Sequence, residues 1–173
     1  AGTRLEWANR FWEGFVMPAI LGVRPSTRSD AAETGLQPVL RTFAARTDEE
    51  CMLEHYGQVL PLEDVHRVLE IVDSITRMPC GCRFLTTGRT DRRYCFGLGI
   101  DRWQVLGRFP EASSSLEVLT RDEAGAIIEG YDREGLVHSI WTGVTPFVIG
   151  LCNCDYDCAA YREYLNGSRC FFK

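Results

Sequence analysis

The sequence predicts an α+β fold that is mostly helical, in which N-terminal helices precede a winged-helix-like helix and β-hairpin unit. Three observations predict it: apolar residues recur at helical spacing, a capping motif begins a helix at Thr120, and two apolar runs follow that helix. Hydrophobic residues make up 45% of the 173 residues, which is enough for a core without disulfides. We expect a helical region over residues 1–58 and a cysteine-rich domain over residues 59–173, or one compact domain overall.

The first part of the chain carries helical patterns. Residues 5–20 place apolar side chains three and four positions apart, which predicts a helix with one face toward the core or toward a partner. Pro18 kinks or ends this helix. Residues 22–35 are polar and predict a loop, and residues 37–45 and 49–56 predict short helices.

A longer helix is predicted from Pro61 to about Thr76. Proline suits the first turn of a helix, and Glu63 and Asp64 lie near the positive end of the helix dipole. Apolar residues then recur on one face as far as Ile75. This helix leads directly into the cysteine-containing segment MPCGCRF.

The next helical pattern begins at Thr120, where Thr120 and Glu123 match the capping box of a helix start. The helix should run to about Arg133, and Gly135 is well placed as its stop. This helix carries several acidic residues and few basic ones, so a winged-helix-like unit here does not predict DNA binding.

A hairpin and a last helix follow. Strands are expected over residues 136–141 and 147–151, with a turn at Gly143 between them. Residues 157–165 predict the last helix, with Asn166 and Gly167 as its end.

The charge of the chain argues against a nucleic-acid partner. The net charge is −5, and every basic residue except Lys173 is an arginine. Residues 77–108 depart from this average with seven arginines and two aspartates, and they overlap the first cysteines. These arginines either offset the charge of bound thiolates or form a solvated surface. No apolar run is long enough to span a membrane.

Six of the eight cysteines form two groups, each of which contains a C-x-C step. The two groups are Cys80, Cys82 and Cys95 in the middle of the chain and Cys152, Cys154 and Cys158 near its end. Glycine or asparagine inside the step would let the backbone bend and turn amide N–H groups toward sulfur. Cys51 and Cys170 stand alone, and the first is expected to be a small buried hydrophobic residue.

The spacing of these thiols leaves three kinds of site open. A disulfide within a C-x-C step would be strained, although pairs between the two groups are allowed. Zinc ribbons carry pairs of C-x2-C knuckles, which this chain lacks. Soft thiolates in a reducing compartment favour an iron–sulfur cluster over zinc and over disulfides or free thiols.

The segments VLPLEDVHRVLEIVDSITRMPCGCRF, YCFGLG, EGLVHSIW and IGLCNCDYDCAAYRE together resemble a family of anaerobic iron–sulfur proteins. In that family a PC-x-C-R motif and a C-x2-LG motif precede a helix, a GLVH strand and a CNC segment. The resemblance covers residues 59–163 and implies a 4Fe–4S cluster. It makes six residues candidate cluster ligands: Cys80, Cys82, Cys95, Cys152, Cys154 and Cys158.

The chain departs from that family in two ways. The family often has a further cysteine between the C-x-C and C-x2-LG motifs, and residues 87–93 supply none. A ferredoxin-type domain with two C-x2-C-x2-C-x3-C runs often follows in the family, whereas this chain stops at Lys173. We therefore expect either a shortened member or a fragment.

The expected function is electron transfer in anaerobic metabolism, in the cytoplasm, with a ferredoxin-like protein or an oxidoreductase as redox partner. Six thiols exceed the four that one 4Fe–4S cube requires, so two are spare or the centre is larger. An alternative is an enzyme whose cube has an open iron, with Asp155, Asp157 or His138 as acid or base. Two further alternatives are a cluster-based redox sensor and a zinc-stabilised interaction domain.

Aromatic side chains flank the middle cysteines. Tyr94, Phe96 and Trp103 either exclude water from a cluster or belong to the ordinary core. The sequence does not distinguish these two roles.

Overall fold

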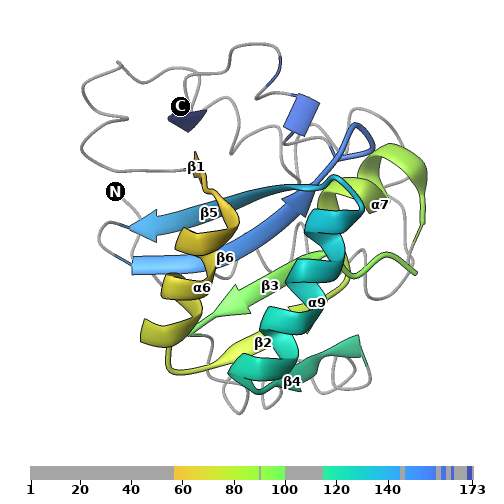
Figure 1. The fold of residues 1–173 in the computed structure, drawn as a ribbon. Coiled ribbons are helices and arrows are strands. Elements are labelled where there is room, and N and C mark those ends of the chain that lie inside the picture. The colour runs from red at the N-terminus through yellow and green to blue at the C-terminus, as the bar shows by residue number, and fades with distance from the viewer. Residues whose placement is uncertain are drawn as a thin grey trace.

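The computed structural model describes residues 57–89, 91–99, 115–144, 147–158, 161–162, 165 and 171–172. These residues form one seven-stranded sheet with three helices (Figure 1). The class α+β is confirmed, but the prediction that the fold is mostly helical is wrong. The missed strands are only two to four residues long, which is too short for an alternating pattern to show in the sequence.

The sheet has the strand order β4-β2-β3-β6-β5-β1-β7, and every pair from β4 to β1 is antiparallel. At the far edge β7 pairs with β1 in parallel. The strands are β1 (Gly57–Val59), β2 (Ile75–Met78), β3 (Cys95–Leu98), β4 (Glu117–Leu119), β5 (Val137–Val144), β6 (Phe147–Cys154) and β7 (Phe171–Phe172).

The predicted hairpin exists but is not a wing. Its strands β5 and β6 lie in the middle of the sheet, where β1 flanks one and β3 the other. Gly143 lies inside β5, and irregular register follows Trp141. The winged-helix-like description is therefore wrong, because this hairpin satisfies its outer backbone groups by pairing with further strands rather than by protruding into solvent.

Helices α6 (Leu62–Ile71) and α9 (Arg121–Arg133) lie side by side across the sheet, and the short helix α7 (Gly81–Thr87) lies at one end of it (Figure 1). The capping box of α9 is confirmed, because Glu123 N–H donates to Thr120 Oγ1 and Thr120 N–H donates to Glu123 Oε2. Gly135 follows α9 with φ of 82°, as a helix stop requires.

The first of these helices is shorter than the sequence predicts. It ends at Ile71, and Val72 is already extended. Ile75 instead begins β2 and pairs with Leu98 on one side and Leu119 on the other. This pairing buries Ile75 in the core, so burial in the sheet outweighs the helical spacing that placed it on α6.

The core fills the space between the two long helices and the sheet. Val65 and Leu69 of α6 and Ile128 of α9 pack with Phe96 and Leu151 of the sheet. Successive residues of a strand point to opposite faces. The residues next to these two in sequence, Cys95 and Cys152, therefore lie on the face away from α6 and α9.

Several predictions fall outside the described residues. These are the helices at residues 5–20, 37–45 and 49–56, together with Cys51, Trp103 and Cys170. In the predicted last helix Tyr161, Arg162 and Leu165 are helical, and the chain makes a turn at residues 156–157. Within the described part of the chain no helix is long and apolar enough to cross a membrane.

Candidate functional site

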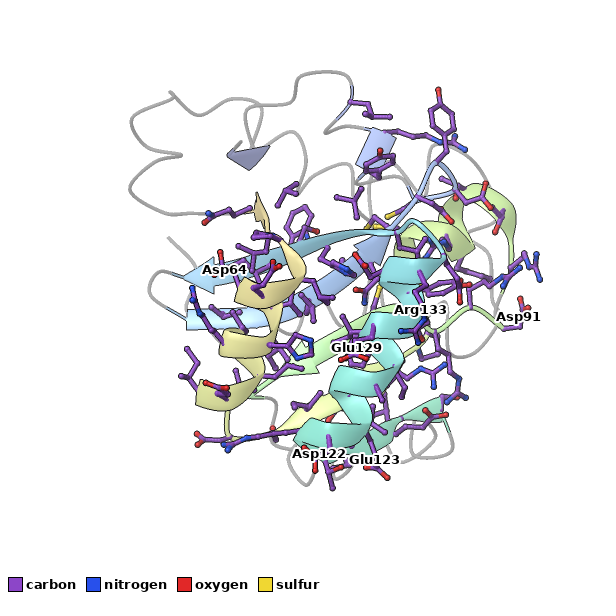
Figure 2. All side chains as sticks on the ribbon, viewed as in Figure 1. Asp64, Asp91, Asp122, Glu123, Glu129 and Arg133 are labelled. Carbon is purple, nitrogen blue, oxygen red and sulfur yellow. The ribbon has the colours of Figure 1, made fainter. Side chains whose placement is uncertain are left out.

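The six predicted site cysteines come together at the end of the sheet that adjoins α7. Figure 2 shows yellow sulfur atoms there, next to α7 and the end of β6. Cys80 precedes α7 and Cys82 lies in its first turn, Cys95 begins β3, and the last three cysteines lie on β6 and in the turn after it. None of the six described cysteines is joined in a disulfide.

The thiols form a continuous series of contacts, which we call the thiol chain. The Sγ atoms are 3.4 Å apart in Cys80 and Cys95 and 3.3 Å apart in Cys154 and Cys158. The thiol of Cys152 also interacts with the thiols of Cys95 and Cys154, and the thiol of Cys82 interacts with that of Cys158. The order along the thiol chain is Cys80, Cys95, Cys152, Cys154, Cys158 and Cys82.

Strand register explains how two distant motifs meet. Cys95 on β3 is the direct cross-strand partner of Cys152 on β6, so both side chains lie on the same face. Cys154 lies two residues further along β6 and therefore shares that face. The prediction that Cys152 and Cys154 follow a strand is corrected, because both lie inside β6.

The donors suit a thiophilic metal, but they do not form a ready-made cage. Within the described residues no group of three or more cysteine, histidine, aspartate or glutamate side chains is arranged to hold a metal ion. The sulfur atoms contact one another in pairs, at 3.4 Å between Cys80 and Cys95 and at 3.3 Å between Cys154 and Cys158. Four of the six cysteines are buried, and a set of soft, water-shielded sulfur donors fits iron–sulfur chemistry or zinc.

Crowding controls the protonation of these thiols. Hydrogen bonding to Cys95 and burial raise the pKa of Cys80, and hydrogen bonding to Cys158 and burial raise the pKa of Cys82. Hydrogen bonding to Cys154 and to Cys95, followed by burial, raises the pKa of Cys152. The pKa of Cys95 is instead lowered to about 5, because hydrogen bonds with Cys152 and Cys80 stabilise its thiolate.

The thiol chain therefore holds one negative charge readily, at Cys95, and further thiolates repel it. The pKa of Cys154 is also raised: its hydrogen bond with Cys152 lowers it, but the one with Cys158 and burial outweigh that effect. Several thiolates become stable together only beside positive charge, which a metal supplies.

Arg83 supplies positive charge within the protein. Its side chain comes from α7 and is only 3% exposed. Nη1 lies 3.7 Å from Cys80 Sγ and donates to the Asn153 carbonyl oxygen at 3.2 Å, and Nη2 lies 2.8 Å from Asp155 Oδ1. Burial alone would lower the pKa of Arg83, but the contacts with Asp155 and Cys80 raise it above its ordinary value.

Tyr94 links this arginine to the first cysteine. The Arg83 guanidinium lies 4.2 Å from the centre of the Tyr94 ring, and the Tyr94 N–H donates to Cys80 Sγ at 3.0 Å. A backbone amide thus does point at sulfur, as expected of a metal–sulfur site. It belongs to Tyr94, directly before β3, and not to a bent C-x-C step. Phe96 packs into the core under α6 and α9, which is the ordinary role weighed for it.

Asn153 lies between two cysteines and is almost fully buried. It is part of the extended strand β6, so the prediction that it bends the chain is wrong. Its Nδ2 donates to the Tyr94 carbonyl oxygen at 2.7 Å, and its Oδ1 lies 2.6 Å from His138 Nδ1. Asn153 therefore locks β6 against the segment that enters β3.

The three acid or base candidates differ in placement. The ring of His138 contacts Asn153 and, at 3.4 Å, Asp132 of α9, so it faces the helices while the strand cysteines face the other way. Asp155 is paired with Arg83. Asp157 is exposed, and its carbonyl oxygen accepts from the Thr86 hydroxyl.

Sequence reasoning missed Arg83 and Asn153 as individual buried residues. Arg83 stands three positions after Cys80 in a helix that begins there, and residues three apart share a helix face. That spacing was the available signal for Arg83. Asn153 lies in a strand between two cysteines, so its side chain points to the opposite face of the sheet. That alternation was the signal available for Asn153.

Comparisons with known proteins add no relative. No protein-family model matches the chain, and no curated protein or solved structure matches it either. The resemblance to anaerobic iron–sulfur proteins therefore stays a prediction from the motifs.

Proposed function

We propose that the chain binds an iron–sulfur cluster at the thiol chain and transfers electrons in anaerobic metabolism. The cluster is of the 4Fe–4S type and uses four of the six thiols, and the protein works in the reducing cytoplasm with a ferredoxin-like protein or an oxidoreductase as partner. One observation carries the proposal: six thiols from separate segments, none of them in a disulfide, gather into one continuous, largely buried series.

The surroundings of the thiols support this choice of cofactor. The irons of a cluster bind thiolates. Here the closeness and burial of the thiols oppose the formation of further thiolates beyond that of Cys95 unless positive charge is added. The N–H of Tyr94 and the guanidinium of Arg83 point at Cys80 Sγ, and hydrogen bonds to sulfur are a main way in which proteins tune such clusters.

Electron transfer is favoured over catalysis at an open iron. A catalytic site needs a free acid or base near the reacting metal. His138 faces the helices and Asp155 is held by Arg83, so two of the three candidates are engaged elsewhere. The redox-sensor alternative depended on a winged-helix-like unit, and its hairpin lies inside the sheet.

A second candidate is a structural zinc site. A tetrahedral zinc with Zn–S bonds of about 2.3 Å separates its sulfur ligands by about 3.8 Å. The observed sulfur separations of 3.3 and 3.4 Å are closer to that spacing than to the wider one of a four-iron cube. This observation favours zinc, whereas the number of thiols does not separate the two metal centres, because a tetrahedral zinc and a 4Fe–4S cube each take four thiolates.

Reversible reduction tests the proposal. Protein prepared without oxygen should be brown, and its visible sulfur-to-iron absorbance should bleach with dithionite and return with a mild oxidant over repeated cycles. Iron retained through those cycles supports electron transfer. Colourless protein that carries zinc would establish the second candidate, and absorbance that is lost irreversibly at the first reduction would contradict a carrier of electrons.

A further inference from the structure

Arg83 is the one charged side chain among the buried residues of the described part that touches the thiol chain. It is 3% exposed, as buried as the core, although an arginine is seldom fully buried without a partner. Its single carboxylate partner, Asp155, has a side chain that is 42% exposed. Water therefore screens the negative charge of Asp155 more strongly than it screens the positive charge of Arg83.

The contacts of Arg83 also span the three segments that carry the cysteines. The residue itself belongs to α7, its guanidinium stacks on Tyr94 just before β3, and it donates to the Asn153 carbonyl oxygen on β6. Nη2 is directed at Asp155 in an ion pair but has no hydrogen bond of good geometry. A cation held this firmly keeps a fixed distance from the sulfur atoms.

We infer that Arg83 sets the reduction potential of the bound cluster, an inference that rests on the proposed function. The step is a one-electron transfer: a reduced partner gives up one electron, the cluster accepts it, and no covalent bond forms or breaks. The cluster becomes more negative by one charge. A fixed positive charge beside Cys80 stabilises that product more than the oxidised form, so it raises the potential.

The test compares midpoint potentials of anaerobically prepared variants, followed by visible absorbance in a redox titration. Arg83→Gln should lower the equilibrium constant for reduction by about tenfold, which is about 59 mV for a one-electron couple. Arg83→Lys keeps the charge and should recover most of that shift. Arg67→Gln removes an equal charge from an exposed position on α6 and should leave the potential unchanged.

A second variant keeps the inference testable if Arg83→Gln fails to fold or to hold iron. Asp155→Asn leaves Arg83 in place and removes its carboxylate partner, so it should raise the potential. If both Arg83→Gln and Asp155→Asn retain iron and keep the wild-type potential, the inferred role of Arg83 is overturned while the proposed function stands. Absence of iron from the wild-type protein would overturn the proposed function and, with it, this inference.

Discussion

Cys95 and Cys152 are direct cross-strand partners in the antiparallel pair of β3 and β6, so their thiols lie on the same face of the sheet and interact. This pairing joins the middle and final cysteine motifs of the sequence, and the contact of Cys82 with Cys158 joins them a second time. The remaining four thiols extend from it in two directions, through Cys80 on one side and Cys154 on the other. The integrity of the site therefore depends on the register of two strands.

The closeness of the sulfur atoms makes the metal-free protein sensitive to oxidation. A disulfide has an S–S bond of about 2.05 Å, so pairs already at 3.3 and 3.4 Å need only a short movement. Diamide should oxidise each pair of thiols to a disulfide with loss of two hydrogens, at Cys80–Cys95 and Cys154–Cys158. Peptide mapping by mass spectrometry checks the pairs.

The same treatment of iron-loaded protein should leave at least one of the two pairs unoxidised, because the cluster binds four of the six thiols and a thiolate that binds a metal is not free to attack. Disulfides that instead join the thiol chain to Cys51 or Cys170 would contradict the described arrangement.

Asn153 should contribute to stability as well as to the shape of the site. Asn153→Ala removes the partner of the buried His138 ring and the side-chain bond to Tyr94, which should cost about 1–3 kcal/mol. Urea unfolding of the metal-free, fully reduced protein measures this loss in the free energy of unfolding. Glu70→Ala, at an exposed position of α6, is the control and should change stability by less than about 0.5 kcal/mol. Equal effects of the two substitutions would show that the Asn153 bonds contribute nothing.

Glu123 should make the stability of the fold depend on acid pH. Hydrogen bonds from the Thr120 backbone N–H, followed by its side chain, lower the pKa of Glu123 from its ordinary value of 4.5. A lowered pKa in the folded state adds stability above pH 4.5, and this contribution is lost as the pH falls through the folded-state pKa. Wild type should therefore exceed Glu123→Gln in stability near neutral pH and lose that advantage in acid. Denaturant unfolding at several pH values checks this, and a difference that is constant over the whole range would refute it.

The sequence predicted the parts of the fold that local chemistry decides. The capping box at Thr120 and the stop at Gly135 define α9, because both signals act within one helix. The short strands could not be found in this way. Ile75 fits a helical face equally well in the sequence, and only its pairing with Leu98 and Leu119 assigns it to β2.

The candidate site shows the same division. That the two cysteine groups would meet could be predicted from their shared thiol chemistry, and the structure brings all six together. Which thiol touches which could not, because the contact of Cys95 with Cys152 depends on register between strands far apart in the sequence. Arg83 was hidden among many arginines, since burial is decided by the packing of α7 against β3 and β6.

Iron and acid-labile sulfide analysis of protein prepared without oxygen tests the central claim most directly. The wild-type chain should carry iron and sulfide in equal amounts, close to four of each per chain for a 4Fe–4S cluster. Cys82→Ser and Cys154→Ser each remove a buried thiol from a different motif, and Cys51→Ser removes one outside both motifs as the control. We predict that at least one of the two site variants loses iron and sulfide together while Cys51→Ser keeps both. Wild-type protein without iron and sulfide, or full retention in both site variants, would contradict an iron–sulfur cluster at the thiol chain.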